Sequence, residues 1–441
     1  MTHLTRRLIF YALVLLFFVA GSGAILYAQG WRLDLSPLRA EKVGAIFVRS
    51  SPGDAEIFLN GAPIENQTDI LSDGTFINNL FPNTYRLTLE ETGYDDWNEN
   101  AMVTPTLIAQ FGDAVLVPSV ASPAASGSVE SFSIEGGEAI TENTSGTVTW
   151  HGNAIGKGAI ISASANLDDV IIKNPATGAL ALYNFTEGTS LNLGALFAGD
   201  GIVPKNIANI GIDPFDATRV IAGNTQKIGT VDLAKGAVTR IAAAAAGDTL
   251  GTSIAPSQSL LAWSVFKTAS DTASIALYDK FADFTTTSSA AVAGENVSLQ
   301  WITGTLLGVL QNDGALYLYD TNAQTFKKMA DGVKSFSASS DGSMIAALET
   351  HSLEVFPLSG NSAYSRFNLP DTADATGVMW YKDDGHLFVK YPDRVAFLDL
   401  NDAALTNFTT VAAGTSPFYD AQANALYLID QNSNLVQFDF P

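Results

Sequence analysis

One short pattern dominates the C-terminal part of the chain. It consists of alternating apolar residues that usually end in an aromatic residue and an Asp or Asn, and it occurs seven times after residue 165. The copies end at Leu182-Tyr183-Asn184, Thr230-Val231-Asp232, Leu277-Tyr278-Asp279, Leu318-Tyr319-Asp320, Val355-Phe356-Pro357, Phe397-Leu398-Asp399 and Gln437-Phe438-Asp439. Successive copies are roughly 37–48 residues apart, near the period of four-stranded β-propeller blades. A pattern of this kind restricts the fold far more than it restricts the function.

A second apolar stretch precedes each copy, and turn residues separate the two stretches. This arrangement predicts a seven-bladed β-propeller. The apparent blades are residues 165–194, 207–242, 253–290, 296–330, 333–369, 375–412 and 416–441.

The last apparent blade has room for only three strands. An earlier segment must supply the fourth strand and close the ring, because an open edge would expose unpaired backbone groups. Gly146–Trp150 reads as a strand and directly precedes the first apparent blade. We therefore expect a closing strand near 146–150 that pairs with the sheet containing Leu435–Phe438, which makes the propeller domain residues 129–441.

An apolar segment of about 20 residues, Leu8 to Tyr27, lies near the N-terminus and is long enough to cross a bilayer as a helix. A cleaved signal peptide is the alternative. The small residues between 20 and 28 do not form a good cleavage site, so an uncleaved signal anchor is favoured. This predicts a cytoplasmic stub and transmembrane helix at 1–30, with the bulk of the chain extracytoplasmic at the cell membrane.

The residues that flank this segment agree with a cytoplasmic N-terminus. Arg6 and Arg7 precede the segment, as the positive-inside rule expects. Tyr27 and Trp31 are placed to form an aromatic belt at the outer interface, although the basic residues that follow Trp31 weaken the assignment of orientation.

Residues 43–117 read as a small antiparallel β-sandwich built from short strands. Asn60-Gly61 is the best hairpin signal, because both residues tolerate a positive φ. Strands are expected at residues 44–49, 55–59, 76–80, 85–90, 101–107 and 109–117.

Three segments of this region resemble a PEGA domain. They are Ser51-Pro-Gly-Asp-Ala-Glu-Ile-Phe-Leu-Asn-Gly61, Leu80-Phe-Pro-Asn-Thr-Tyr-Arg-Leu87 and Gly93-Tyr-Asp-Asp-Trp97, in the order of that family. Asn83 stands where the family usually has Gly, and Glu65–Asp69 replaces its usual central turn. The resemblance implies a small β-domain of prokaryotic surface proteins, a spacer or interaction module that carries no catalytic residues.

Tyr94 and Trp97 are the candidate site residues of this domain. Their aromatic rings either form a face on which a ligand stacks or fill the core of the sandwich, and the second interpretation is favoured. Residues 118–128 are small and polar and include Pro118 and Pro123, which predicts a flexible linker to the propeller.

One blade carries a second resemblance. Ser339-Ser-Asp-Gly-Ser-Met-Ile-Ala346 is similar to the turn of TolB-like and WD-like propeller repeats, and Ala255–Ala262 is a weaker copy. The resemblance covers two blades, and it supports the fold rather than an activity.

Composition excludes several classes of site. The 441 residues carry a net charge of -22, which disfavours nucleic acid as a partner. No cysteine is present, so disulfides, thiolate metal sites and a lipoprotein anchor are excluded. The four His, His3, His151, His351 and His386, lack metal-ligand spacing, and no cofactor motif occurs. We expect no metal and no cofactor.

Paired carboxylates are the one feature that could indicate catalysis. They occur at Asp168-Asp169, Asp213 with Asp216, and Asp383-Asp384. Carboxylates in blade turns more often accept hydrogen bonds from nearby backbone N–H groups, whereas a glycosidase needs two of them across a cleft.

These observations favour a non-enzymatic binding or scaffold protein of a prokaryotic cell envelope. It would bind protein or envelope polysaccharide through its propeller loops. The alternative is an envelope carbohydrate-active hydrolase or lyase that uses propeller carboxylates. Carboxylates that converge beneath a pocket would favour the enzyme, and dispersed carboxylates would favour binding.

Overall fold

The computed structural model describes residues 3–35, 38–68, 73–125, 127–359, 364–370, 374–402 and 405–441. The chain divides into two compact units. Unit 1 comprises Met1–Val120 and Phe440–Pro441, and unit 2 comprises Ala121–Asp439. Strands make up 56% of the chain and helices 7%, which confirms the expectation of a mostly β protein with one apolar N-terminal helix.

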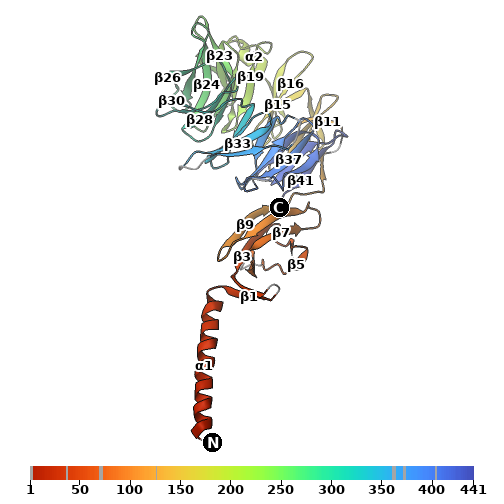
Figure 1. Ribbon diagram of the computed structural model, residues 1–441. Helices are drawn as coiled ribbons and strands as arrows, with labels where there is room; N and C mark the ends of the chain where they lie inside the picture. The colour runs from red at the N-terminus through yellow and green to blue at the C-terminus, as the bar shows by residue number, and fades with distance from the viewer. Residues whose placement is uncertain are drawn as a thin grey trace. The chain divides into compact units, whose positions relative to one another are not determined.

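Unit 1 begins with helix α1 (His3–Ala28), drawn in dark red in Figure 1. Its segment Leu4–Ala28 is strongly apolar, and none of it is buried against the protein. It is long and apolar enough to be a membrane span or a signal sequence.

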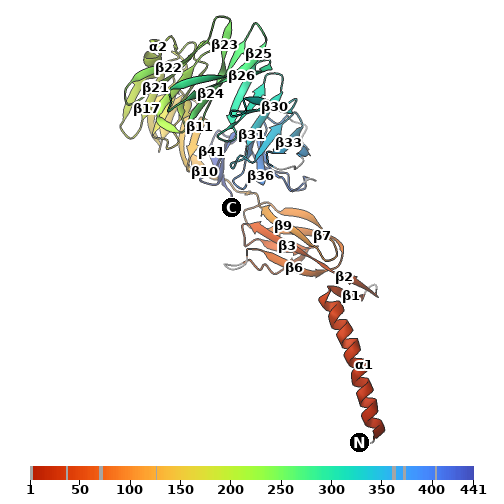
Figure 2. The same ribbon diagram turned by 90° about the vertical axis from the view of Figure 1, so that its left-hand side faces the viewer.

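The rest of unit 1 is built from a hairpin and two sheets. A hairpin, β1 (Trp31–Leu35) and β2 (Leu38–Lys42), follows the helix. One sheet has the order β6 (Thr75–Leu80), β3 (Gly44–Ser51), β9 (Ile108–Val115), visible in Figure 2. The other has the order β5 (Ala62–Ile64), β4 (Glu56–Leu59), β7 (Asn83–Glu90), β8 (Trp97–Val103). Side chains from both sheets form one apolar core, which includes Ile46, Leu87 and Leu89.

The strands of these two sheets lie close to the predicted ranges. Asn60 and Gly61, with φ of 52° and 77°, form the predicted tight turn between β4 and β5, where Leu59 pairs with Ala62. The expectation of a wholly antiparallel arrangement is wrong, because β9 runs parallel to β3. The chain reaches β9 only after it has crossed to the other sheet and back, so no tight hairpin fixes β9 as antiparallel.

The described residues of unit 2 form eight four-stranded antiparallel sheets. The first four are β11 (Val129–Glu135), β12 (Glu138–Asn143), β13 (Thr147–Trp150) and β14 (Asn153–Lys157); β15 (Ala159–Ala163), β16 (Asp169–Lys173), β17 (Leu180–Asn184) and β18 (Thr189–Asn192); β19 (Asn209–Asp213), β20 (Asp216–Gly223), β21 (Lys227–Asp232) and β22 (Ala237–Ala243); β23 (Asp248–Pro256), β24 (Leu260–Lys267), β25 (Thr272–Asp279) and β26 (Phe284–Ala293). Helix α2 (Leu193–Ala198) follows β18, and the Asn192 side chain caps it by accepting the N–H of Ala195.

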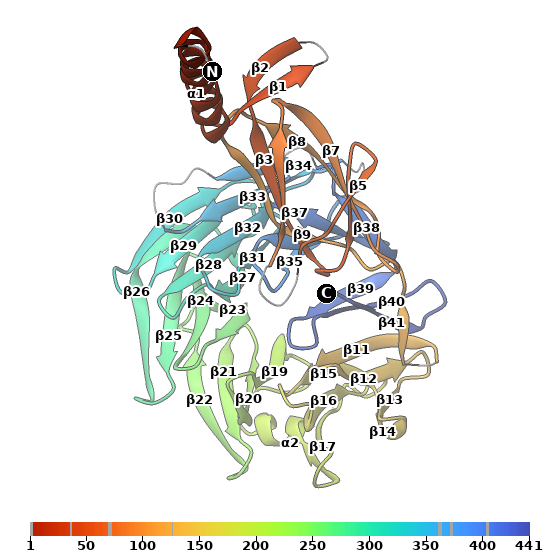
Figure 3. The same ribbon diagram turned by 90° about the horizontal axis from the view of Figure 1, so that it is seen from below.

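The remaining four sheets continue in the same way. They are β27 (Asn296–Trp301), β28 (Leu306–Gln311), β29 (Leu316–Asp320) and β30 (Thr325–Ala330); β31 (Ser335–Ala338), β32 (Met344–Leu348), β33 (Ser352–Pro357) and β34 (Ser365–Asn368); β35 (Gly377–Trp380), β36 (His386–Lys390), β37 (Arg394–Asp399) and β38 (Thr409–Ala413); and β10 (Ser122–Ala125) with β41 (Leu435–Asp439), β40 (Ala425–Ile429) and β39 (Thr415–Asp420). From β11 to β35 the first strand of each sheet neighbours that of the next; β37 then neighbours β39, and β39 neighbours β11, so the sheets follow one another around a ring (Figure 3).

Unit 2 is therefore an eight-bladed propeller, and the prediction of seven blades is wrong. The additional blade is the sheet β11–β14, in the segment from which only one strand was predicted. Its third strand ends at Trp150, followed by His151 and Gly152 with positive φ, so the blade lacks the aromatic-Asp ending that most of the others have. The predicted ranges of the other seven blades overlap sheets of the ring, and the strands of one of them span 296–330 as predicted, but the range 165–194 omits β15, the first strand of its sheet.

The closing strand was also predicted in the wrong place. Residues 147–150 form β13, which pairs with β12 and β14 inside the first blade. The strand that completes the last blade is β10, which pairs with β41 through Ser122 and Gln437. It lies within the predicted linker at 118–128 and contains Pro123, which an edge strand tolerates because one side of it needs no backbone partner.

The repeated ending has a structural role in several blades. Tyr278, Tyr319 and Phe397 are buried in the apolar core. The acidic residue that ends the strand binds the next turn: Asp279 Oδ1 accepts backbone N–H groups of the turn at 2.8 Å. Asp320 Oδ1 does the same in its own blade.

Candidate functional site

The two candidate residues of unit 1 do not form an exposed aromatic face. Trp97 is only 6% exposed and packs in the core, with its ring 5.9 Å from that of Phe111. Tyr94 is half-buried and packs against the same core. The structure thus agrees with the core-filling interpretation and leaves no indole surface on which a ligand could stack.

Two of the carboxylate pairs in unit 2 hold local structure. Asp168 accepts hydrogen bonds from Asn166 and Thr186, and Asp169 accepts one from Asn184 at 2.9 Å. Burial raises the pKa of Asp169. Both side chains bind within their own blade; Asp169 also lines, together with Glu187, a cavity of about 490 Å³ between this blade and the next.

Asp213 and Asp216 also bind separate partners. Asp213 is 1% exposed, and its Oδ2 lies 2.5 Å from Lys280 Nζ of the next blade. Lys280 Nζ also donates to the Ser257 carbonyl oxygen at 2.6 Å. Asp216 pairs with Arg219 at 3.0 Å. The buried Asp213–Lys280 pair joins two neighbouring blades and has no access to a ligand.

The third pair, Asp383 and Asp384, stabilises the turn between β35 and β36 and the blade beside it. Asp384 accepts hydrogen bonds from Ser340, in the neighbouring β31–β32 turn, through Ser340 N at 2.9 Å and Ser340 Oγ at 2.7 Å. Asp383 Oδ2 lies 2.8 Å from His386 Nδ1. Burial acts to raise the pKa of Asp383, but the hydrogen bond and attraction to His386 outweigh it and hold that pKa below its ordinary value.

His386 belongs to the interior of its blade. The side chain is 1% exposed, and its ring stacks on Phe397 with centroids 5.1 Å apart. Its Nε2 lies 3.8 Å from Asp399, a buried carboxyl whose pKa is raised by that burial. Within the ranges that the structure covers, no three His, Asp or Glu side chains gather in a group able to hold a metal ion.

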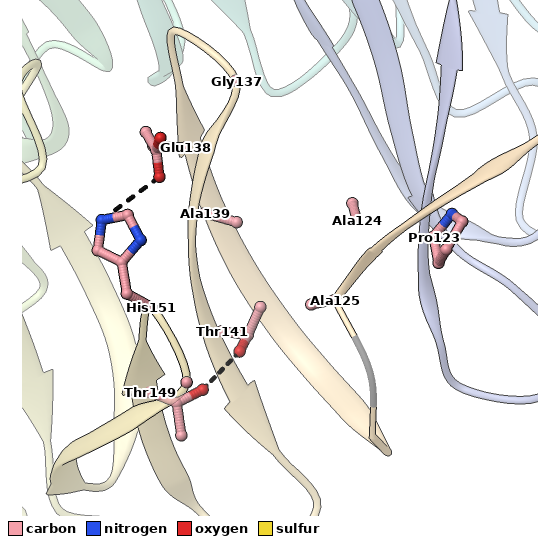
Figure 4. Close-up of a pocket in the computed structure, with 10 residues that line it drawn as sticks. Pro123, Ala124, Ala125, Gly137, Glu138, Ala139, Thr141, Thr149 and His151 are labelled. Atoms are coloured by element: carbon pink, nitrogen blue, oxygen red, sulfur yellow. Dashed lines mark hydrogen bonds and ion pairs between the residues drawn. The ribbon is translucent and has the colours of Figure 1, made fainter.

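A cavity of about 500 Å³ lies between the last and first blades, beside β10 and the β12–β13 hairpin (Figure 4). Its lining is mostly small: Pro123, Ala124, Ala125, Gly137, Ala139 and Gly152, with Glu138, Thr141, Thr149 and His151. His151 Nε2 lies 3.4 Å from Glu138 Oε2, and the two threonine hydroxyls are 2.8 Å apart. Glu138 is the one carboxylate among these lining residues, so the cavity lacks the second carboxylate that glycoside hydrolysis requires.

The most unusual surface of unit 2 is a group of exposed phenylalanines, here called the phenylalanine rim: Phe215, Phe281 and Phe284. They are 59%, 81% and 62% exposed, the highest values for large apolar side chains in the described part of unit 2. Large exposed apolar groups that gather on one surface mark interaction sites.

The rim is held by the turns of two consecutive blades. Phe215 lies between β19 and β20, and its N–H donates to Asp213 Oδ1 at 3.0 Å. Phe281 lies between β25 and β26, and Phe284 begins β26. Lys280 Nζ lies 5.7 Å from the centre of the Phe215 ring, which places the two turns side by side. The buried Asp213–Lys280 pair thus lies beneath the rim and fixes its turns.

Sequence reasoning did not identify the rim. Phe215 and Phe281 lie inside blade turns, where polar residues are usual. The presence of an aromatic residue in such a turn was the only sequence signal for an exposed apolar surface. The rim belongs to the blades that the sequence analysis placed at 207–242 and 253–290.

No family model and no curated protein matches the sequence. Solved structures with a related backbone include an oligogalacturonate lyase in complex with manganese, with 8% identity, a TM-score of 0.47, and 74% of this chain and 97% of that chain covered. An oligogalacturonate lyase from Vibrio parahaemolyticus has 9% identity and a TM-score of 0.47, with 70% of this chain and 96% of that chain covered. The Cps50 (Swd1) β-propeller domain of Myceliophteria thermophila has 12% identity and a TM-score of 0.41, with 61% of this chain and 96% of that chain covered. Likeness at this level assigns no substrate and no reaction to this chain.

Proposed function

We propose that this chain is a membrane-anchored binding or scaffold protein of a prokaryotic cell envelope. Helix α1 anchors it with a cytoplasmic N-terminus, unit 1 is a PEGA-like spacer, and the propeller binds a partner protein through the phenylalanine rim. The observation that carries the proposal is the exposure of the three phenylalanines on adjacent turns.

The chemistry of the rim favours a protein over a polysaccharide as its partner. Aromatic residues are enriched at the centres of protein interfaces, where they supply large apolar contact areas. A sugar-binding face needs polar groups beside its rings to bind the hydroxyls. The carboxylates beside the rim already have partners: Asp213 binds Lys280, Asp216 binds Arg219, and Asp283 accepts the Tyr278 hydroxyl.

A binding role also agrees with the state of the paired carboxylates. Each pair weighed as a catalytic candidate binds Lys, Arg, His, Ser, Asn or Thr side chains of its own or the next blade. Carboxylates committed in this way support a structural role in the blades rather than hydrolysis or elimination.

The anchor rests on α1 and on the residues around it. Its apolar segment is long enough to span a bilayer, and Arg6 and Arg7 lie at its N-terminal end, the side that the positive-inside rule places in the cytoplasm. The PEGA-like assignment of unit 1 rests on the three sequence segments that resemble that family.

The test compares proteins that co-purify with three versions of the full chain. These are the wild type, a rim variant with Phe215, Phe281 and Phe284 changed to Ser, and a control with Phe418→Ser, which changes an exposed aromatic residue elsewhere in unit 2. Hot-spot truncations cost about 2 kcal/mol or more, so we expect the rim variant to lose at least about tenfold of one specific protein. The control should retain that protein. If the three versions yield the same proteins, or if the difference is a polysaccharide, the proposal is wrong.

A further inference from the structure

The β1–β2 hairpin is attached directly to the end of the apolar helix. Gln29 and Gly30 continue the hydrogen bonding of the last helical turn, and Gly30 then turns the chain with a φ of 85°. The N–H of Val43, just after β2, donates to the Gly30 carbonyl oxygen at 3.0 Å. Both ends of the hairpin are thus fixed at the helix terminus.

Arg32 strengthens this attachment. Its Nη1 donates to the carbonyl oxygens of Tyr27 at 2.8 Å and Trp31 at 3.0 Å, and its guanidinium lies 3.7 Å from the centre of the Tyr27 ring. Its Nε donates to Asn79 Oδ1 of the sandwich at 3.1 Å. One cation therefore connects the last helical turn, the hairpin and the sandwich.

One face of the hairpin is mostly apolar, and the other carries charged residues. Trp31 pairs with Lys42 and Leu33 pairs with Ala40, so these four side chains share one face. Leu33 is 62% exposed. On the opposite face, Arg32 pairs with Glu41, two residues of opposite charge. Such a division is expected where one face lies against an apolar phase.

Position and composition together identify the occupant of the apolar face. The hairpin begins three residues after the end of α1, at the level where a spanning helix leaves the hydrocarbon. Trp is enriched at that depth because its ring is amphipathic. Lys42 Nζ, 5.9 Å from the centre of the Trp31 ring, adds a cation beside the indole that can bind a lipid phosphate.

We propose that the β1–β2 hairpin is a membrane-interface element whose face of Trp31, Leu33 and Ala40 lies in the headgroup and upper acyl region of the bilayer. The occupant is the lipid surface itself. The hairpin then fixes the orientation of the sandwich at the membrane through Arg32. This inference rests on the proposed function, since it requires α1 to span the membrane.

The experiment reconstitutes the full chain into vesicles of phosphatidylcholine and phosphatidylglycerol, with some lipids brominated near the headgroup end of the acyl chain. The chain has six Trp, so the emission of Trp31 is the difference between the wild type and Trp31→Phe. We expect brominated lipid to quench at least half of that difference. Leu33→Asp should reduce the quenching at least twofold, because it places a charge in the interface. Met102→Asp, at an exposed residue of β8, should leave it unchanged.

The outcomes separate the two proposals. Protein that stays with the vesicles after an alkaline wash, but whose Trp31 emission is not quenched, overturns the hairpin proposal alone and points to a protein or a second copy as occupant. Protein that the wash removes overturns the anchor, and the hairpin proposal with it.

Discussion

The buried pair beneath the phenylalanine rim gives the sharpest test of how the blades are held together. Lys280→Met keeps most of the side-chain volume but removes the ammonium group. Asp213 Oδ2 then loses its partner at 2.5 Å, and the Ser257 carbonyl oxygen loses its donor at 2.6 Å. The Asp213 side chain is 1% exposed, so water does not replace the lost cation in the folded structure.

The expected cost follows from that burial. Removing one partner of a buried ion pair leaves a charge without compensation and typically costs about 3–5 kcal/mol. The Lys280 side chain is 8% exposed, so this pair belongs to the buried class. The exposed pair Lys235–Asp232, with 77% of the Lys235 side chain accessible, belongs to the opposite class, in which solvent screens the attraction.

The assay is urea unfolding at neutral pH, followed by tryptophan fluorescence, for the wild type, Lys280→Met and Lys235→Met. We expect a large drop in the midpoint for Lys280→Met and no measurable change for Lys235→Met. The double variant Asp213→Asn with Lys280→Met removes both charges and keeps an acceptor for the Phe215 N–H. It should therefore be more stable than Lys280→Met alone. A cost below about 1 kcal/mol for Lys280→Met, or a double variant less stable than the single one, would refute this reasoning.

Three further predictions test the turns and the ring. Gly342→Ala should destabilise more than Gly247→Ala, by at least about 1 kcal/mol in unfolding experiments. Both have positive φ, but a Cβ at Gly342 would lie 2.5 Å from a carbonyl oxygen of the neighbouring blade, whereas Gly247 has nothing within 4 Å. Backbone N–H groups hold the pKa of Asp279 below its ordinary value. The stabilising effect of the Asp279 carboxylate is therefore present above the unfolded pKa of about 4 and is lost as pH falls through the folded pKa. The melting temperature of Asp279→Asn should therefore fall less than that of the wild type as the pH is lowered. Ser122→Cys with Gln437→Cys should form a disulfide, detected by a mobility shift on reduction, because these residues pair in the closing blade.

Each of these has a result that contradicts it. Equal costs for the two glycine variants would show that no close contact exists at Gly342. An acid melting curve that Asp279→Asn leaves unchanged would show that the turn does not bind this carboxylate. Because the chain has no natural cysteine, any disulfide must join the two introduced residues. A disulfide between Thr149→Cys and Gln437→Cys, with none between Ser122→Cys and Gln437→Cys, would show that residues 146–150 form the closing strand.

The parts of the fold that sequence predicted are those encoded locally. Alternating apolar residues and turn residues within one blade located the strands of 296–330, and Asn60-Gly61 located a two-residue turn because few residue pairs adopt its positive φ values. In both cases the information lies within a few residues of the element that it specifies.

The first blade and the closing strand depend on long-range pairing instead. Ser122–Ala125 has the composition of a linker and becomes a strand only because β41, more than three hundred residues later, offers a free edge. The β11–β14 blade ends its third strand without the aromatic-Asp marker, so the repeat did not reveal it. The blade count was therefore wrong even though the period was right.

The exposure of individual side chains was the other property that could not be predicted from the sequence. Phe281 and Phe397 are the same residue type in the same kind of repeat, yet one is 81% exposed and the other 2%. Phe397 lies inside strand β37, whereas Phe281 lies in the turn that follows β25. The sequence located the carboxylate pairs, but their partners, Lys280 for Asp213 and Ser340 for Asp384, come from adjacent blades.

Site-specific photo-crosslinking in living cells tests the central claim most directly. A benzoylphenylalanine placed at Phe281 in the full chain probes the phenylalanine rim, and the same residue placed at Phe418 probes another exposed position of unit 2. We predict a discrete protein adduct from position 281 that disappears when Phe215 and Phe284 are changed to Ser, and no such adduct from position 418. An adduct at 418 with none at 281, or an adduct at 281 that persists in the Ser variant, would contradict the account.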